Sequence, residues 1–181
     1  MRTLLNLHDT VFGRFEDMAG QWLLPTLARF SFAAVLLFYF WNSAKTKIGD
    51  GIFGFLNPGV GAYASILPKQ MEAAGFDPSL IGFGGKLVVY AGTWAEFVLP
   101  ALIIVGLFSR MAALGMIGFI VVQSIVDITG HGADASTIGK LFDRISDSLI
   151  LDQRTLWVLL LITIMIKGGG PLSLDRLMGR T

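Results

Sequence analysis

The stretch that decides the fold spans residues 86–128 and reads KLVVYAGTWAEFVLPALIIVGLFSRMAALGMIGFIVVQSIVDI. It contains two apolar segments, 86–108 and 110–128, each of about the 20 residues that a helix needs to cross a bilayer. Only Ser109 and Arg110 separate these segments. We therefore predict two antiparallel membrane-spanning helices joined by a very tight turn.

Two further apolar segments, 23–41 and 149–167, are long enough for the same purpose. The whole chain agrees with this pattern, because 54% of its residues are hydrophobic and only 15% are charged. Soluble domains carry about 25% charged residues. The sequence predicts an all-α membrane protein, a four-transmembrane-helix bundle over residues 23–177 whose principal partner is the lipid bilayer.

Three segments lie outside the predicted spans. Residues 1–22 place apolar side chains at helical spacing and read as an amphipathic helix on the membrane surface. A short solvated helix docked on the bundle is the alternative. Residues 42–85 and 129–154 read as extracytoplasmic connections, with short helices expected at 62–67 and 69–74 and another amphipathic helix in the polar stretch up to Ile150.

Charge and cysteine content exclude several classes of function. The net charge of +1 argues against nucleic acid as a partner. The chain has no cysteine, so disulfides, thiolate metal sites and iron–sulfur clusters within it are excluded. Four spans put both termini on one side, and the excess of basic residues there predicts that this side is cytoplasmic. These basic residues are Arg2, Arg14, Arg110, Lys167, Arg176 and Arg180.

Two ionisable residues fall inside predicted spans, where a charge is costly. Glu96 lies about 15 Å along its helix from Lys86, and Arg29 lies about 9 Å inside the first span. Pro100 follows Glu96 by one turn and is expected to kink the helix there. We predict an Arg29–Glu96 ion pair inside the bundle. The alternative has Arg29 reaching to the headgroups and Glu96 protonated.

A second polar group is expected at the outer end of the third span. Gln123, Asp127 and His131 recur every fourth residue and face one way, and Lys45 and Lys47 follow the first span at the same membrane level. The functional interpretation is a proton-accepting or ligand-contacting site, since histidine titrates near neutrality. The alternative is a helix end with ordinary solvated groups. A metal site that adds Asp134 and Glu96 is weakly indicated, because only one histidine contributes, and none is expected.

Three motifs resemble the DoxX family of small bacterial membrane proteins. They are AEFVLP at 95–100, GLFSR at 106–110 and GPLSLD at 170–175. The resemblance covers about residues 22–177, whereas the polar insert at 131–154 is longer than the family's compact loop. The resemblance implies a four-helix protein of the bacterial inner membrane, and some relatives are associated with quinone-linked or other membrane oxidoreductase complexes.

The functional expectation is accordingly a subunit of, or accessory to, a membrane oxidoreductase, with quinone as the possible ligand and other proteins of a membrane complex as possible partners. The sequence has no self-contained catalytic motif, so whether the chain is itself an enzyme stays open. The alternative is a non-enzymatic small transporter or a membrane scaffold. Glu96 is central to both hypotheses.

Overall fold

The computed structural model describes residues 2–51 and 53–180. Within these ranges every regular element is helical, with a single isolated bridge between Ile48 and Pro58 in place of any strand. The α-helices are α1 (Arg2–Ala19), α2 (Leu23–Phe32), α3 (Phe38–Lys45), α4 (Val60–Ile66), α5 (Pro68–Ala73), α6 (Phe83–Val105), α7 (Ser109–Ile125), α8 (Ala135–Ile138), α9 (Arg154–Lys167) and α10 (Leu174–Leu177).

Short π-helical segments extend three of the predicted spans. Ala33–Leu37 joins α2 to α3, Val126–Gly130 continues α7, and Leu149–Gln153 leads into α9. With these segments the four continuous helices are Leu23–Lys45, Phe83–Val105, Ser109–Gly130 and Leu149–Lys167, of 23, 23, 22 and 19 residues. All four are long and apolar enough to cross a bilayer. The prediction of a multi-pass four-helix membrane bundle is confirmed.

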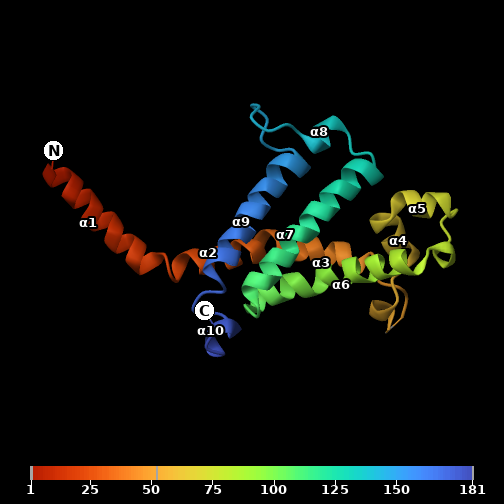
Figure 1. Ribbon diagram of the computed structural model, residues 1–181, viewed down its shortest axis with the longest axis horizontal. Coiled ribbons are helices and arrows are strands. Elements are labelled where there is room, and N and C mark those ends of the chain that lie inside the picture. Colours follow the sequence, from red (N-terminus) through yellow and green to blue (C-terminus); the bar gives the residue numbers. More distant parts are fainter. Residues whose placement is uncertain (1, 52, 181) are drawn as a thin grey trace.

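The four helices form a wedge. Figure 1 shows α7 and α9 meeting α2 and α6 near the α6–α7 turn and diverging from α3 and α6 toward the opposite end of the molecule. We call the first region the terminal end, because both the start of α2 and the C-terminal segment lie there, and the second the loop end. The narrow part of the wedge holds the main apolar core, which includes Phe32, Met116, Leu161 and Ile164.

The turn between α6 and α7 lies at residues 106–108, slightly earlier than predicted. Gly106 and Phe108 both adopt left-handed backbone conformations, with φ of +73° and +49°. A Cβ on Gly106 would lie 2.5 Å from the Cβ of Ser173, so only glycine allows the C-terminal segment to approach this turn. The helix itself runs through Pro100 and ends at Val105.

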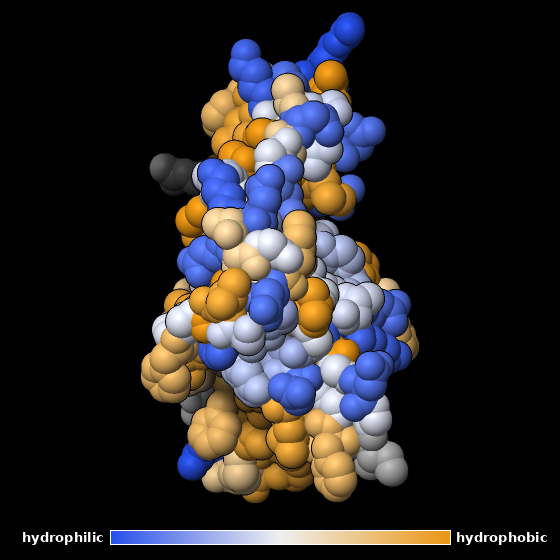
Figure 2. All heavy atoms as spheres, turned by 90° about the vertical axis from the view of Figure 1, so that its right-hand side faces the viewer, coloured by the Kyte–Doolittle hydropathy of each residue, from blue (hydrophilic) through white to orange (hydrophobic). Residues whose placement is uncertain are grey.

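The connection 46–82 folds against the first half of α6. The predicted short helices are present as α4 and α5, and Tyr63, Met71, Ile81 and Val89 form a second apolar cluster there. Figure 2 looks onto this end and shows hydrophilic and hydrophobic side chains side by side over the upper and middle parts and mostly hydrophobic ones at the bottom. The connection 46–82 therefore packs against the part of α6 that extends beyond the end of α3.

The prediction of an amphipathic helix in the polar insert is wrong. Between α8 and Leu149 the chain is irregular, and Phe142 is fully exposed with φ of +63°. The apolar side chains of this stretch have no surface to pack against, and an isolated helix of this length is unstable in water.

Helix α1 extends away from the bundle (Figure 1), and its apolar side chains are exposed. Phe12, Phe15 and Met18, for example, are 59%, 61% and 72% exposed. The position of α1 on a membrane surface stays a prediction.

Candidate ligand-binding cleft beside Glu96

A cleft of about 540 Å³ occupies the open part of the wedge. Its walls are α6 and α7, and α4 covers it from the loop end through Ser65 and Ile66. Gly92 and Gly118 leave space in the cleft, because neither has a side chain to fill it. The Cβ position of Gly118 has no neighbour within 4 Å. The polar residues that line the cleft are Ser43, Thr46, Lys47, Ser65, Glu96, Gln123, Asp127 and His131.

The deepest polar feature of the cleft is an ion pair between Lys47 and Glu96. The ammonium group of Lys47 donates to Oε1 and Oε2 of Glu96 at 2.9 and 2.8 Å and to Oγ of Ser43 at 2.7 Å. The hydroxyl of Ser43 in turn donates to Oε1 of Glu96 at 3.3 Å. Both charged side chains are buried, with exposures of 7% and 3%, so each neutralises the cost of burying the other.

The predicted Arg29–Glu96 ion pair is wrong. Arg29 donates to main-chain carbonyls at the terminal end: to Ile103 O at 2.9 Å, to Gly169 O at 2.7 Å, to Leu172 O at 2.6 Å, and to Ile104 O. The last carbonyls of a helix have no intrahelical donor and carry partial negative charge. Arginine therefore finds its acceptors at the end of α6, about 10 Å along the helix from Glu96.

Glu96 lies less deep than counting along its own helix indicates. Its carboxylate is level with Ser43, only two residues before α3 ends at Lys45. The indole of Trp41 donates to the carbonyl of Phe97 at 3.2 Å, which fixes the same register. Since the first half of α6 packs against α4 instead of α3, a lysine just beyond α3 reaches the middle of α6.

The three polar residues predicted at the outer end of the third span all line the cleft, but each has a different partner. Asp127 accepts from Nη2 of Arg154 at 2.5 Å. Gln123 donates to the Tyr39 hydroxyl at 3.2 Å. Asp127 therefore joins α9 to the end of α7, and Arg154 is buried in this contact, with an exposure of only 3%.

His131 closes the cleft at the loop end. Its Nε2 donates to the carbonyl of Ser65 at 3.0 Å, which links the end of α7 to α4. Beside this bond, a Cβ on Gly130 would lie 2.7 Å from Cγ of Pro68, so the two segments are in close contact. Among the described residues no group of three or more His, Asp or Glu side chains is placed to hold a metal ion.

Lys45 is exposed and does not line the cleft, whereas Lys47 does. The sequence carries a signal for this choice. Ser43 and Lys47 are four residues apart, so the helical spacing places them on one face, although α3 itself ends at Lys45. This spacing from a serine indicates that Lys47, and not Lys45, is the partner of the one acid in the second span, Glu96.

Three buried polar side-chain atoms have no hydrogen-bond partner within the described part of the chain: Oγ1 of Thr93, Oε1 of Gln123 and Nε of Arg154. Gln123 lines the cleft, so its carbonyl oxygen is a free acceptor there. Buried polar atoms are seldom left unpaired. The cleft thus combines apolar walls, a bound lysine, a carboxylate and a free amide oxygen, a set suited to a mostly apolar ligand with a few polar groups.

Comparisons with known proteins found no match: no family model, no curated protein and no solved structure is significantly similar to this chain.

Proposed function

We propose that the chain is a membrane subunit of, or accessory to, a quinone-linked oxidoreductase assembly, and that a quinone binds in the cleft beside Glu96. The observation that carries the proposal is the combination of a 540 Å³ apolar cleft between two membrane-spanning helices with buried polar groups on its wall. A quinone has the same make-up, an apolar ring and tail with two carbonyl oxygens.

Each polar group of the cleft has a role in this proposal. The amide nitrogen of Gln123 donates to a quinone oxygen, while Glu96 and the free oxygen of Gln123 accept from the hydroxyls of the quinol. Lys47 keeps its bonds to Glu96 and Ser43 and holds the carboxylate in place. The chain has no cysteine, so a partner protein supplies the electrons. The resemblance to the DoxX family supports a bacterial inner-membrane location, and the basic residues on the side of the termini support placing both termini in the cytoplasm.

The test fills the cleft without disturbing its walls. A Cβ at Gly118 meets nothing within 4 Å, and leucine favours a helix over glycine by about 1 kcal/mol. Gly118→Leu should therefore fold normally but lose quinone, measured by mass spectrometry of the lipid extract and by binding of decylubiquinone to the purified protein. Gly84→Leu is the matched control, because Gly84 also has an open Cβ position on α6 and lies outside the cleft.

A wild-type protein that carries no quinone and binds no decylubiquinone contradicts the proposal, as does unchanged binding by Gly118→Leu. In that case the alternative, a non-enzymatic transporter or scaffold, is favoured. One observation supports it: the Lys47–Glu96 pair is saturated by hydrogen bonds within the protein, as a purely structural contact would be. A scaffold should tolerate Glu96→Gln with its partners still bound.

A further inference from the structure

A second cavity, of about 480 Å³, lies at the terminal end of the bundle, away from the cleft. It is bounded by the α6–α7 turn, the end of α9, the loop 168–171 and the C-terminal segment, with Trp22 at its rim. Helix α2 begins at Leu23, α7 begins at Ser109 and α9 ends at Lys167. The cavity therefore lies where three spans meet water, the level of the lipid headgroups.

The cavity is strongly basic. Four cationic side chains line it: Arg110, Lys167, Arg176 and Arg180. All four are exposed, and within residues 2–51 and 53–180 none of them forms a salt bridge or donates a side-chain hydrogen bond. Arg29 and Arg154, in contrast, are buried and bonded. The lining cations thus hold no other segment through a side-chain hydrogen bond or an ion pair.

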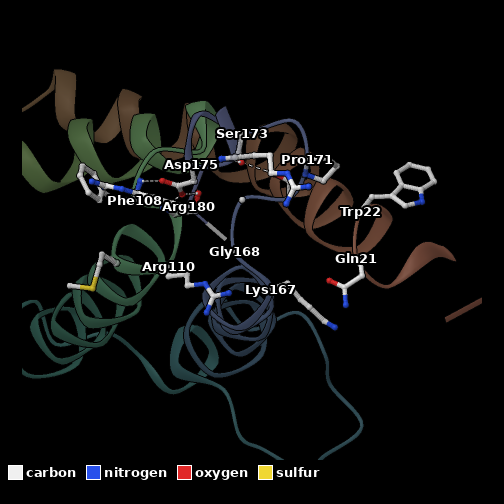
Figure 3. A pocket seen from close by; sticks show the side chains of 15 residues that line it. Gln21, Trp22, Phe108, Arg110, Lys167, Gly168, Pro171, Ser173, Asp175 and Arg180 are labelled. Carbon is white, nitrogen blue, oxygen red and sulfur yellow. Dashed lines mark hydrogen bonds between the residues drawn. The ribbon is translucent and has the colours of Figure 1, made fainter. Parts of the chain in front are cut away.

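The acid in the cavity, Asp175, forms no salt bridge with these four cations. Asp175 is turned toward the start of α7 (Figure 3), where it accepts from Phe108 N at 2.7 Å, Ser109 N at 2.8 Å and Ser109 Oγ at 2.7 Å. Its charge is therefore taken up by the helix N-terminus. The guanidinium of Arg180 lies 4.8 Å from the centre of the Phe108 ring, which leaves its N–H groups available.

The loop 168–171, which we call the glycine loop, positions the side chain of Arg110. Gly168 has φ of +76°, and a Cβ there would lie 3.4 Å from Nε of Arg110. The loop is thus shaped so that the Arg110 guanidinium lies against it, and Figure 3 shows Arg110 and Lys167 on the α7 and α9 side of this loop. Trp22 and Met111 add apolar surface to the lining, and tryptophan favours the membrane interface.

We propose that this cavity binds the phosphate headgroup of an anionic phospholipid. Basic pockets between spans at the cytoplasmic surface are suited to such headgroups, and arginine matches phosphate geometry through paired hydrogen bonds. The apolar side chains at the rim receive the start of the acyl chains. A free phosphate shares the headgroup's chemistry but would not use that apolar surface, so the experiment separates the two sources.

The test uses the full-length protein in phosphatidylcholine nanodiscs with and without phosphatidylglycerol, followed by native mass spectrometry of retained lipid. Wild type should retain phosphatidylglycerol, and Arg110→Gln/Arg176→Gln should retain it less, by roughly fivefold for each cation removed. Lys69→Gln/Arg144→Gln is the control, since it removes the same charge from exposed residues outside the cavity. It should behave as wild type.

Equal retention by both double variants overturns the proposal. A phosphatidylglycerol that is displaced by inorganic phosphate alone also overturns it and identifies a soluble anion as the occupant. If Arg110→Gln/Arg176→Gln fails to insert, the single variants give the same comparison at half the effect, with thermal stability in detergent confirming that each is folded.

Discussion

At the scale of single residues, the charges inside the spans decide which helices meet. Lys47 and Glu96 are 49 positions apart and fasten α3 to α6. Arg154 and Asp127 fasten α9 to α7. Arg29 forms no salt bridge with any carboxylate of residues 2–51 and 53–180 and joins the ends of α6 and α9 through main-chain carbonyls. Arginine suits this last role, because its planar fork reaches several acceptors at once.

Breaking the buried pair on one side only should be costly. Lys47→Met leaves the Glu96 carboxylate buried without its cation, and we expect the free energy of unfolding in detergent to fall by about 3–5 kcal/mol. Lys47→Met/Glu96→Leu removes both charges and should recover most of that loss. Lys45→Met, two residues away and exposed, should change little. A double variant no more stable than the single would show that the two side chains do not interact as described.

At the scale of elements, α7 is capped by a residue from the far end of the chain. Asp175 accepts from the first N–H groups of the helix, the role that an N-cap residue usually plays locally. The residue before α7 is Phe108, which cannot cap. The tight turn therefore depends on the C-terminal segment, and the backbone bond from Asp175 N to Gly106 O at 2.8 Å strengthens the same contact.

This cap makes stability depend on pH. Burial raises the pKa of Asp175, but the hydrogen bonds from Ser109 and Phe108 outweigh it and hold the pKa below 3.8. Because the folded pKa is lower than the unfolded one, the cap stabilises the protein above about pH 4 and is lost as pH falls through the folded pKa. The melting temperature of wild type should exceed that of Asp175→Asn at pH 7, and the gap should shrink toward pH 3.

Asp50→Asn is the control for this measurement, since Asp50 is an exposed loop residue with no hydrogen bond to a helix end. A gap between wild type and Asp175→Asn that stays constant from pH 7 to pH 3 would mean that the carboxylate does not contribute through its charge.

At the scale of the whole molecule, the bundle has a cleft between α6 and α7, and α1 projects from its terminal end. The wedge between α6 and α7 is closed at the loop end by α4 and His131. At the terminal end α1 carries an exposed apolar face away from the bundle (Figure 1). A membrane surface is the natural cover for that face, because amphipathic helices bind there by burying apolar side chains.

The absence of cysteine makes the orientation of α1 measurable with single spin labels. Positions 11 and 13 lie on opposite faces of the helix. In vesicles, a label at Val11→Cys should be accessible to oxygen dissolved in the lipid, and a label at Gly13→Cys to a water-soluble nickel chelate. Equal access of the chelate to both positions would show that α1 lies in water instead.

The sequence by itself determined the four spans, the short helices of the first connection and the polar residues around the cleft. Span length and hydropathy are local properties, and a polar residue in an apolar run is conspicuous without a structure. Glu96 was therefore found, as were Gln123, Asp127 and His131, but as two separate polar groups, which the structure brings together around one cleft. Lys45 and Lys47 were placed at the same membrane level, because hydropathy alone does not decide which of two lysines after a span faces the cleft.

Only the tertiary structure decided which charges pair and where the two cavities lie. The partner of a buried charge depends on the level at which two helices meet, and the packing of α4 against the first half of α6 shifts that level in favour of Lys47. Likewise, Arg110, Lys167 and Arg176 belong to three separate segments and become one basic surface only when the glycine loop and the C-terminal segment fold over the α6–α7 turn. Such positions follow from packing between distant segments, which no local pattern encodes.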